Sequence, residues 1–337
     1  MFVLGIETSC DETSAAVLDD GRVKSNVISS QLVHQKYGGV VPELASRAHQ
    51  RMIIEVVDEA LRCSGITKQQ LHGIAATQGP GLVGALLVGL NFAKAMAYGL
   101  NIPFIAVNHM EGHLYSDFLM DDQPRFPFVS LIVSGGHTML VHVRAPFDHQ
   151  LLGQTRDDAA GEAFDKVAKM LKLGYPGGPI IDKNAATGNP RAIRFPRTFL
   201  EEGTYDFSFS GVKTAVLYYL KKNGWLDDPE FIAPDHLNDI CASFQEAVVE
   251  VLARKTIEAA NELRVKDVAL AGGVSANSRL RSKMREVCEK EGVRLFYPKP
   301  EYCMDNGAMI AYVGWLRLQR GFVSSNDLPA VANLELV

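Results

Sequence analysis

Apolar and polar positions form the same pattern twice along the chain. Residues 3–18 read VLGIE, then TSCDETS, then AAVL, and residues 128–143 read FVSLIV, then SGGHT, then MLVHV. In both segments apolar runs flank a turn made of Gly, Ser, Thr and Asp or His, which is typical of a β-hairpin. Such turns can direct several backbone N–H groups and hydroxyls at one point, an arrangement suited to phosphate. Because each copy opens one half of the chain, we predict two related lobes that face a shared cleft.

Helices and strands alternate between and after these two hairpins. The spacing of apolar residues predicts helices over residues 42–63, 82–98, 158–171, 237–263 and 278–290, and a closing helix from about residue 306. Short apolar runs predict strands over residues 73–77, 103–107, 267–270 and 294–297. Strands separated by helices of this length indicate an α/β fold with largely parallel sheets.

Composition and charge narrow the class of protein. The chain has 337 residues, of which 47% are apolar, so it can form about two domains that each bury a core, and disorder is excluded. Its 34 Lys and Arg residues are outnumbered by 39 Asp and Glu residues, for a net charge of −5. A free-standing nucleic-acid-binding protein normally carries a basic excess, because cations on the protein replace the counterions of phosphates. If nucleic acid is a substrate, another component must help to hold it.

The cysteines and the apolar segments predict a cytoplasmic protein that does not span a membrane. The five cysteines are scattered and form no Cys-x-x-Cys pair, which favours a reducing compartment over disulfides or a Cys-rich zinc site. The N-terminus has no basic region or cleavage site typical of a secretory signal. The most apolar stretch, residues 82–100, contains Asn91 and Lys94 and is interpreted as a buried helix.

The clearest candidate for chemistry is the segment His109-Met-Glu-Gly-His113. On a helix this spacing places two imidazoles about 40° apart and one turn along the same face, which suits two ligands of one metal ion. Glu111 lies about 200° round the helix from His109, so it does not match the zinc-peptidase pattern, in which Glu follows the first His directly. The alternative is two surface or helix-capping histidines, and a third ligand is needed to decide. Asp305, at the predicted N-cap of the last helix, is the best candidate, and two histidines with one aspartate suit zinc or ferrous iron with open coordination positions.

Two glycine-rich loops are open to more than one interpretation. Residues 270–277 (LAGGVSAN) follow a predicted strand and open a helix. The glycines allow close approach of another molecule, and Ser275 can cap a helix whose N-terminus favours an anion, but such turns are also common as plain structure. Residues 175–179 (YPGGP) either reverse the chain or lie against a flat ligand face.

Acidic residues in two segments have a structural and a functional interpretation. Asp157, Asp158 and Glu162 are explained by the dipole of a helix beginning near residue 158, whereas Asp165 lies further in and can accept hydrogen bonds from ligand hydroxyls. Asp11 and Glu12 are either solvated turn residues or groups that orient a metal, a water or an amine. Residues 206–213 (DFSFSGVK) predict core packing or a substrate contact.

Nine segments lie in order along the chain, between residues 5 and 277. They are GIETSCDETS (5–14), GGVVPELASRAH (38–49), GPGLVGALLVG (79–89), NHMEGH (108–113), IVSGGHT (132–138), DDAAGEAFDK (157–166), YPGGP (175–179), DFSFSGVKT (206–214) and AGGVSAN (271–277). Together they resemble the TsaD family of tRNA adenosine threonylcarbamoyltransferases, formerly mislabelled sialoglycoprotein endopeptidases. The length and the lack of a fused kinase resemble the bacterial branch.

The resemblance implies the fold of the actin-like ATPase superfamily (ASKHA), an α/β fold with two related lobes around a nucleotide cleft. On this basis we expect an N-terminal lobe at residues 1–126 and a C-terminal lobe at residues 127–305. Residues 306–337 are expected to form a closing helix and tail that packs back on the N-terminal lobe.

The resemblance also implies an activity and the residues that perform it. The family transfers a threonylcarbamoyl group from threonylcarbamoyl-AMP to N6 of adenosine 37, just 3′ of the anticodon, in tRNAs that read ANN codons, and AMP is released. His109, His113 and Asp305 would bind one divalent ion, Fe²⁺ before Zn²⁺. The residues expected to contact the adenylate part of the donor are Ile132, Val133, Ser134, Gly135, Gly136, Asp165, Gly178, Asp182 and Asn277.

Further roles follow from the same resemblance. Turn N–H groups from Ser134 to Gly136 would face the phosphate, and Asp165 and Asp182 would accept from nucleoside hydroxyls. Asp11 is the candidate for orienting or deprotonating the amine. Ile132 replaces the more usual Leu, a mild change.

The expected partners are tRNA, a shorter inactive paralogue (TsaB) and a small P-loop ATPase (TsaE). The competing functions are an actin-like ATPase or sugar kinase, which shares the hairpins but not the metal triad, and a metalloprotease, which needs a base near the metal.

Overall fold

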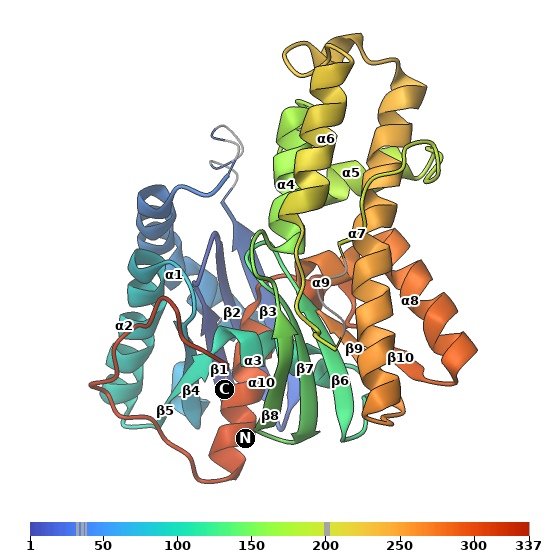
Figure 1. The fold of residues 1–337 in the computed structure, drawn as a ribbon. Helices are drawn as coiled ribbons and strands as arrows, with labels where there is room; N and C mark the ends of the chain where they lie inside the picture. Colours follow the sequence, from blue (N-terminus) through green and yellow to red (C-terminus); the bar gives the residue numbers. More distant parts are fainter. Residues whose placement is uncertain (32–33, 35–36, 38, 199–202, 337) are drawn as a thin grey trace. The chain divides into compact units, whose positions relative to one another are not determined.

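The computed structural model describes residues 1–337 apart from 32–33, 35–36, 38, 199–202 and 337. Gly38, the first residue of one of the nine segments, therefore lies outside the described residues. The chain forms two compact units, one of Met1–Gln123 with Pro298–Leu336 and one of Pro124–Tyr297 (Figure 1).

The first unit is built on a five-stranded sheet in the order β3-β2-β1-β4-β5. Its strands are β1 (Phe2–Glu7), β2 (Glu12–Asp19), β3 (Arg22–Ser30), β4 (Gly73–Gly79) and β5 (Phe104–Asn108). The first three form an antiparallel meander, while β4 and β5 extend the sheet parallel to β1. The predicted hairpin over residues 3–18 is thus confirmed, with a third strand added.

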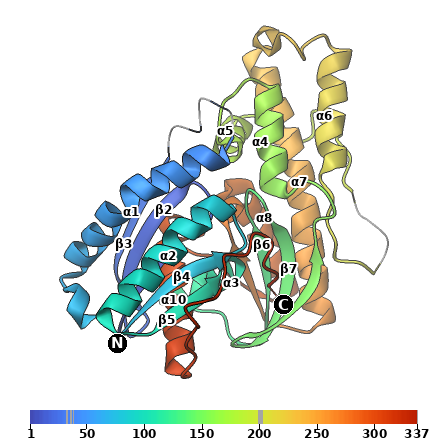
Figure 2. The same cartoon turned by 90° about the vertical axis from the view of Figure 1, so that its left-hand side faces the viewer.

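Helices cover both faces of this first sheet. The helices of this unit are α1 (Pro42–Ser64), α2 (Val83–Leu100), α3 (His109–Leu114), α9 (Pro300–Cys303) and α10 (Gly307–Gln319), and α1, α2 and α10 cover the sheet. Leu4 and Ile6 of β1 pack with Ile53 of α1 and Leu90 of α2, so these two helices lie on one face (Figure 2). Alternate side chains of a strand point to opposite faces, and α10 covers the other one.

Two glycines let α10 lie directly on the sheet. A Cβ at Gly5 would be 2.3 Å from the carbonyl oxygen of Gly307, and a Cβ at Gly307 would be 2.6 Å from the backbone nitrogen of Ala16. Real Cβ atoms do not approach other atoms this closely, so neither position can carry a side chain. This contact fixes the start of α10, and with it Asp305, against the end of β1.

The second unit repeats the design of the first. Its sheet has the order β10-β9-β6-β7-β8, again an antiparallel three-strand meander extended by two strands parallel to its first strand. The strands are β6 (Phe128–Val133), β7 (Thr138–Ala145), β8 (Asp148–Gln154), β9 (Asp267–Ala271) and β10 (Arg294–Phe296). The predicted hairpin over residues 128–143 and the predicted duplication of one design are confirmed.

The core of the second unit is largely aliphatic but includes several phenylalanines. Its helices are α4 (Ala160–Met170), α5 (Gly177–Ala185), α6 (Ser210–Lys222), α7 (Pro234–Glu262) and α8 (Ser278–Glu291). Phe164 of α4 and Phe244 of α7 meet edge to face at 5.2 Å. Phe207 and Phe209, which precede α6, are buried in the same core, as the core-packing interpretation of residues 206–213 predicts.

Asp157 acts on a helix other than the one that follows it. The helix expected from residue 158 begins at Ala160, three residues after Asp157. The Asp157 carboxylate instead accepts hydrogen bonds from the N–H groups of Phe209 and Ser210 at the start of α6. Asp157 therefore accepts from the free N–H groups at the start of α6, about 50 residues further along the chain, and not from those of α4, the helix that follows it.

Helix α2 is the most apolar helix among the described residues. Leu86, Leu90 and Ala93 are buried against β4 and β5, while Leu87 and Tyr98 are exposed. By length and composition alone, with a mean hydropathy of 1.4, it could also cross a membrane. A single helix of this kind is weak evidence, because core helices of globular proteins have the same composition.

Candidate active site

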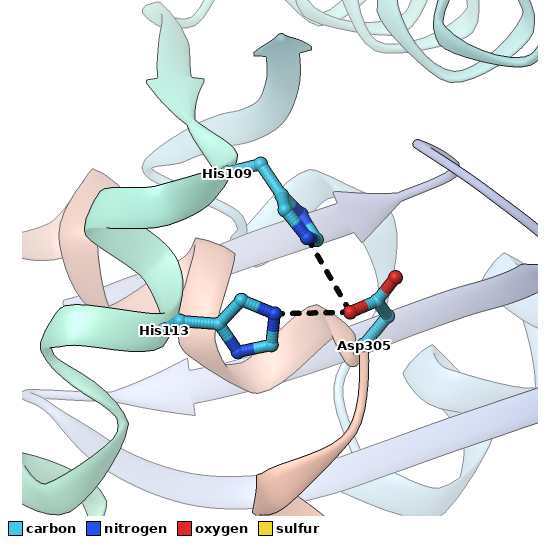
Figure 3. Close-up of side chains that lie close together, drawn as sticks. All are labelled: His109, His113 and Asp305. Carbon is cyan, nitrogen blue, oxygen red and sulfur yellow. Dashed lines mark hydrogen bonds and ion pairs between the residues drawn. The ribbon is translucent and has the colours of Figure 1, made fainter. Parts of the chain in front are cut away.

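Three predicted metal ligands converge in the first unit. Helix α3 starts directly after β5 and is capped by Asn108, whose Oδ1 accepts from the N–H of Met110 at 2.8 Å. His109 and His113 lie one turn apart on this helix, with their rings at 82° to each other. Both Nε2 atoms point at Oδ1 of Asp305, at 3.4 Å from His109 and 3.1 Å from His113 (Figure 3).

The spacing of these donor atoms fits a transition-metal ion. Ligand atoms bound at about 2.0–2.1 Å lie about 3.0 Å apart at octahedral angles and about 3.4 Å apart at tetrahedral angles. The two Nε2–Oδ1 separations are close to these values, and all three donor atoms lie within 4.8 Å of one another. The histidine side chains are at most 7% exposed, whereas Asp305 keeps 19% exposure. The set can therefore hold a cation and leave a coordination position open on the side of Asp305.

Asp305 reaches the histidines for a reason that the sequence did not predict. The N-cap of α10 is Asn306, whose Oδ1 accepts from the N–H of Met309 at 3.0 Å. The predicted capping role of Asp305 is thus wrong. Because its neighbour caps the helix, the Asp305 carboxylate is available to the two imidazoles.

The electrostatics of this cluster favour a positive charge. Burial would raise the pKa of Asp305, but the charge of His109 more than offsets this and holds that pKa below its usual value. For His109, burial would lower the pKa, but the carboxylates of Asp305 and Glu7 raise it well above its ordinary value. In the metal-free protein a proton on His109 thus supplies the charge that a metal ion would otherwise bring.

Glu111 points away from the metal ligands. Its Oε2 accepts a hydrogen bond from Arg317 of α10 at 2.6 Å, and its side chain is buried against that helix. Burial raises the pKa of Glu111 despite the opposing charge of Arg317. This placement agrees with the sequence argument that Glu111 cannot act as a base on a metal-bound water.

The turn between β1 and β2 adds two carboxylates beside the cluster. Asp11 is half-buried, and Glu12 is buried. Burial, followed by the negative charges of Asp305 and Asp11, raises the pKa of Glu12 to about 10. The sequence left Glu12 open between a solvated turn residue and a group that orients a ligand, because a Glu at the start of a strand gives no signal of burial in sequence.

The raised pKa of Glu12 predicts a pH-dependent stability. An unfolded Glu titrates near 4.5 and folded Glu12 near 10, so between these values only the unfolded state releases the proton. The contribution of Glu12 to the free energy of unfolding therefore falls as pH rises through this window. In chelator-treated protein, Glu12→Gln should raise the melting temperature by several degrees near pH 8 and much less near pH 4. Equal effects at the two pH values would contradict the shift.

In the second unit, the turn after β6 presents two open glycines. The N–H of Ser134 donates to the carbonyl of His137 at 2.8 Å, and Ser134 Oγ accepts from the N–H of His137 at 3.1 Å. Gly135 and Gly136 are exposed, and a Cβ on either would meet no atom within 4 Å. Ile132 and Val133 lie in β6 and are fully buried, so only their backbone is near this turn.

The loop after β9 lies against the end of β6. Gly272 has a φ of +82°, and a Cβ there would be 2.5 Å from the carbonyl oxygen of Val133. The loop ends at Asn277, whose Oδ1 accepts from the N–H of Leu280 and so caps α8. The prediction that Ser275 caps this helix is wrong: Ser275 is fully buried, two residues before the cap.

The turn and the loop are linked to each other through the N-terminal parts of three helices. The N–H of Gly161 in α4 donates to the carbonyl of Ser134 at 3.2 Å. Asp165 of α4 accepts from the N–H of Gly177, the first residue of α5, at 2.7 Å. Asp182 of α5 accepts from the N–H of Ser278, the first residue of α8, at 3.0 Å.

These contacts form a closed circuit, which we call the contact ring. It consists of the turn at residues 134–137, the first two turns of α4 and α5, the first turn of α8, and the loop at residues 272–277. It lies at the carboxyl ends of the parallel strands β6 and β9, where α/β sheets commonly bind ligands. Helix N-termini favour anions, and Gly178 in the first turn of α5 also has open space at its Cβ position. The predicted residues Ser134, Gly135, Gly136, Asp165, Gly178, Asp182 and Asn277 all belong to the contact ring.

Comparisons with known proteins give a consistent result. The family model of tRNA N6-adenosine threonylcarbamoyltransferase (TsaD) matches residues 22–312. Proteins of that name from Salinibacter ruber and Chlorobium phaeobacteroides are 54% and 52% identical to the chain, over 100% and 99% of both sequences.

Solved structures support the predicted fold class. HypF from T. kodakarensis has a TM-score of 0.61 at 18% identity, and the match covers 97% of this chain and 49% of HypF. The activator of 2-hydroxyisocaproyl-CoA dehydratase from Clostridium difficile, with bound ADPNP, has a TM-score of 0.50 at 12% identity, covering 96% of this chain and 99% of the activator. At these identities the likeness concerns the fold alone, and it agrees with the actin-like ATPase superfamily.

Proposed function

The chain belongs to the tRNA N6-adenosine threonylcarbamoyltransferase (TsaD) family, and from this premise we propose its substrates and the roles of its residues. The donor is threonylcarbamoyl-AMP, and the acceptor is N6 of adenosine 37 in tRNAs that read ANN codons. The observation that carries the proposal is the contact ring, which joins the N-terminal parts of α4, α5 and α8 and leaves open space at Gly135 and Gly136, where the phosphate of an adenylate can approach the backbone.

The reaction breaks a mixed anhydride. The N6 lone pair attacks the carbamoyl carbon, the bond from that carbon to the phosphate oxygen breaks, AMP leaves with the electron pair, and N6 loses a proton. An adenine amine is a poor nucleophile, so the enzyme must act by positioning the reactants and stabilising charge. We assign the orientation or deprotonation of the amine to Asp11, which lies in the turn beside the buried carboxylate of Glu12.

His109, His113 and Asp305 would hold one divalent ion, Fe²⁺ first and Zn²⁺ second, since nitrogen and carboxylate donors suit both. When bound, the ion supplies Lewis-acid polarisation of donor oxygens. The chain's own contribution is to hold the two imidazoles and the carboxylate at the separations described, with the histidine side chains at most 7% exposed.

The contact ring would bind the adenylate part of the donor. Because the Ser134 N–H already bonds to His137, the N–H groups of Gly135 and Gly136 are the ones assigned to the phosphate. Asp165 and Asp182 already accept from backbone N–H groups. A carboxylate has about four acceptor positions, so each can also accept from a nucleoside hydroxyl.

The activity assignment can be separated from that of an ATPase or sugar kinase of the same fold. Release of AMP that requires both threonylcarbamoyl-AMP and unmodified tRNA would support the transfer reaction. Steady hydrolysis of ATP in the absence of tRNA and of the carbamoyl donor would instead favour the ATPase.

The net charge of −5 predicts that the isolated chain binds tRNA weakly. We propose that a TsaB-like paralogue and a TsaE-like ATPase supply part of the surface that neutralises phosphates. Filter binding or fluorescence anisotropy with unmodified tRNA at physiological salt should give a dissociation constant above about 1 µM for the chain alone. Submicromolar binding by the isolated chain would refute this division of labour.

A further inference from the structure

A carboxylate outside the ligand set is buried beside His109. Glu7 is the last residue of β1 and is fully buried, and its Oε2 lies 3.0 Å from Nδ1 of His109. The same oxygen accepts from the hydroxyl of Thr77, and the other oxygen accepts from the N–H of Ser9. Among the described residues Glu7 has no Lys or Arg partner. A buried carboxylate without a Lys or Arg partner is costly in a protein interior unless another group compensates it, so its contact with His109 calls for an explanation.

The topology of the sheet brings these groups together. Strands β1, β4 and β5 are neighbours and run parallel, so their carboxyl ends meet at one edge. Glu7 ends β1, Thr77 lies near the end of β4, and His109 follows β5 directly. The contact between Glu7 and His109 is thus fixed by strand register, on the side of the imidazole away from Asp305.

We propose that Glu7 is a positioning residue for the metal centre: it accepts a hydrogen bond from Nδ1–H of His109 and so fixes the tautomer whose Nε2 faces the metal. The inference goes beyond the ligand set and rests on the proposed metal site. A ligating histidine needs its metal-facing nitrogen unprotonated, and a carboxylate on the other nitrogen holds the ring in that tautomer and orientation.

Glu7 lies outside the set of metal ligands, as a positioning residue must. It is not part of the group of donor atoms that lie within 4.8 Å of one another, which contains only His109, His113 and Asp305 among the described residues. Nδ1 of His113 has no hydrogen-bond partner among those residues, so only one of the two imidazoles is oriented by a carboxylate.

The charge balance agrees with the proposal. A divalent ion together with the carboxylates of Asp305 and Glu7 has no net charge, which is the favourable state for a buried cluster. Without Glu7 the ion, the two neutral histidines and Asp305 together would carry a net charge of +1.

Ser9 is the competing partner of His109. Its hydroxyl lies 3.2 Å from the same Nδ1. A hydrogen bond to a carboxylate is stronger than one to a neutral hydroxyl and is also the shorter of the two here, so Glu7 is assigned as the acceptor. Ser9→Ala is therefore a matched control that removes the competing contact and leaves Glu7 in place.

Glutamine at position 7 would disturb the hydrogen bonds without changing the shape of the side chain. Both Glu7 oxygens accept from donors: one from Ser9, the other from Thr77 and His109. An amide must place its NH₂ group against one of these donors. It either opposes the Ser9 N–H or drives His109 toward the tautomer that is protonated on the metal-facing nitrogen.

The experiment measures metal binding by the full chain in the absence of tRNA and donor. Affinities for Co²⁺ and Zn²⁺ are obtained by competition with a chromogenic chelator, and the absorption spectrum of the Co²⁺ form reports the coordination geometry. Glu7→Gln should weaken binding by about 10–100-fold and alter the Co²⁺ spectrum, while Ser9→Ala should stay within about twofold of the wild type. Thr77→Val, which removes a donor that holds Glu7, should give a smaller loss.

The outcomes separate this inference from the transferase proposal. Wild-type affinity and an unchanged Co²⁺ spectrum in Glu7→Gln would overturn the inference, as would an equal loss of affinity in Ser9→Ala. If Glu7→Gln does not fold, Thr77→Val decides: weakened binding by folded protein supports the role of Glu7, and unchanged binding overturns it. Because no tRNA is present, the metal affinities do not depend on whether the chain performs the transfer reaction. Unchanged metal binding in Glu7→Gln would likewise leave the transferase proposal standing.

Discussion

Replacing His113 with alanine is expected to abolish tight metal binding and to slow threonylcarbamoyl transfer by on the order of 10³-fold or more, while the fold is retained. Metal polarisation contributes several kcal/mol to such reactions, and each 1.4 kcal/mol corresponds to about a factor of ten. His113 is the cleaner of the two histidines to remove, because loss of His109 would also leave the buried carboxylate of Glu7 without its partner. His113 contacts Asp305 through Nε2.

The measurement pairs metal content by elemental mass spectrometry with modified nucleoside per tRNA. His72→Ala, which changes an exposed histidine of the same unit, should leave both values unchanged. Full transfer activity in His113→Ala with no bound metal would remove the metal centre from the mechanism.

Gly136→Val is expected to weaken binding of the adenylate donor by about 10–100-fold without lowering the melting temperature. A Cβ at this position meets no protein atom within 4 Å, and the backbone is not in the left-handed region, so the free protein accommodates the change. The added side chain would occupy the place assigned to the phosphate. Loss of one charge-assisted hydrogen bond, worth about 1.5–3 kcal/mol, corresponds to this range.

Calorimetry with a non-hydrolysable adenylate analogue measures the effect directly. Gly99→Val is the matched control, because Gly99 also has open space at its Cβ position but lies at the end of α2 in the first unit. Its donor affinity should equal that of the wild type. Wild-type donor affinity in Gly136→Val would exclude the turn at residues 134–137 from the phosphate site.

The fold was predictable where apolar residues follow a regular period. The two hairpins and the alternation of helices and strands lie in such segments, and they confirm the α/β class. Strand β3 was missed because its sequence, RVKSNVISS, is largely polar, and β8 (DHQLLGQ) lacks β-branched residues. Both are edge strands that bury little surface, so packing leaves a weak pattern in their sequence. Helix α5 begins with two glycines, which are poor helix formers.

The candidate site was predictable where its residues are close in sequence. The spacing of His109 and His113 on one helix suggested a metal pair, and the structure brings Asp305 to both. The expected reason for the position of Asp305 was wrong, because the cap is Asn306. Which residues lie beside a ligand can depend on how the strands align, and the local sequence contains no information on that alignment. Glu7 illustrates this most clearly, since only the register of β1, β4 and β5 places it beside His109.

The most direct test of the central claim is analysis of tRNA nucleosides by mass spectrometry. Unmodified tRNA is incubated with the chain, its candidate partners, threonine, bicarbonate, ATP and an enzyme that makes the adenylate. The account predicts threonylcarbamoyladenosine at the position 3′ of the anticodon, with none formed by the His113→Ala variant. Unmodified adenosine at that position in the complete wild-type reaction, with the donor shown to be present, would contradict it.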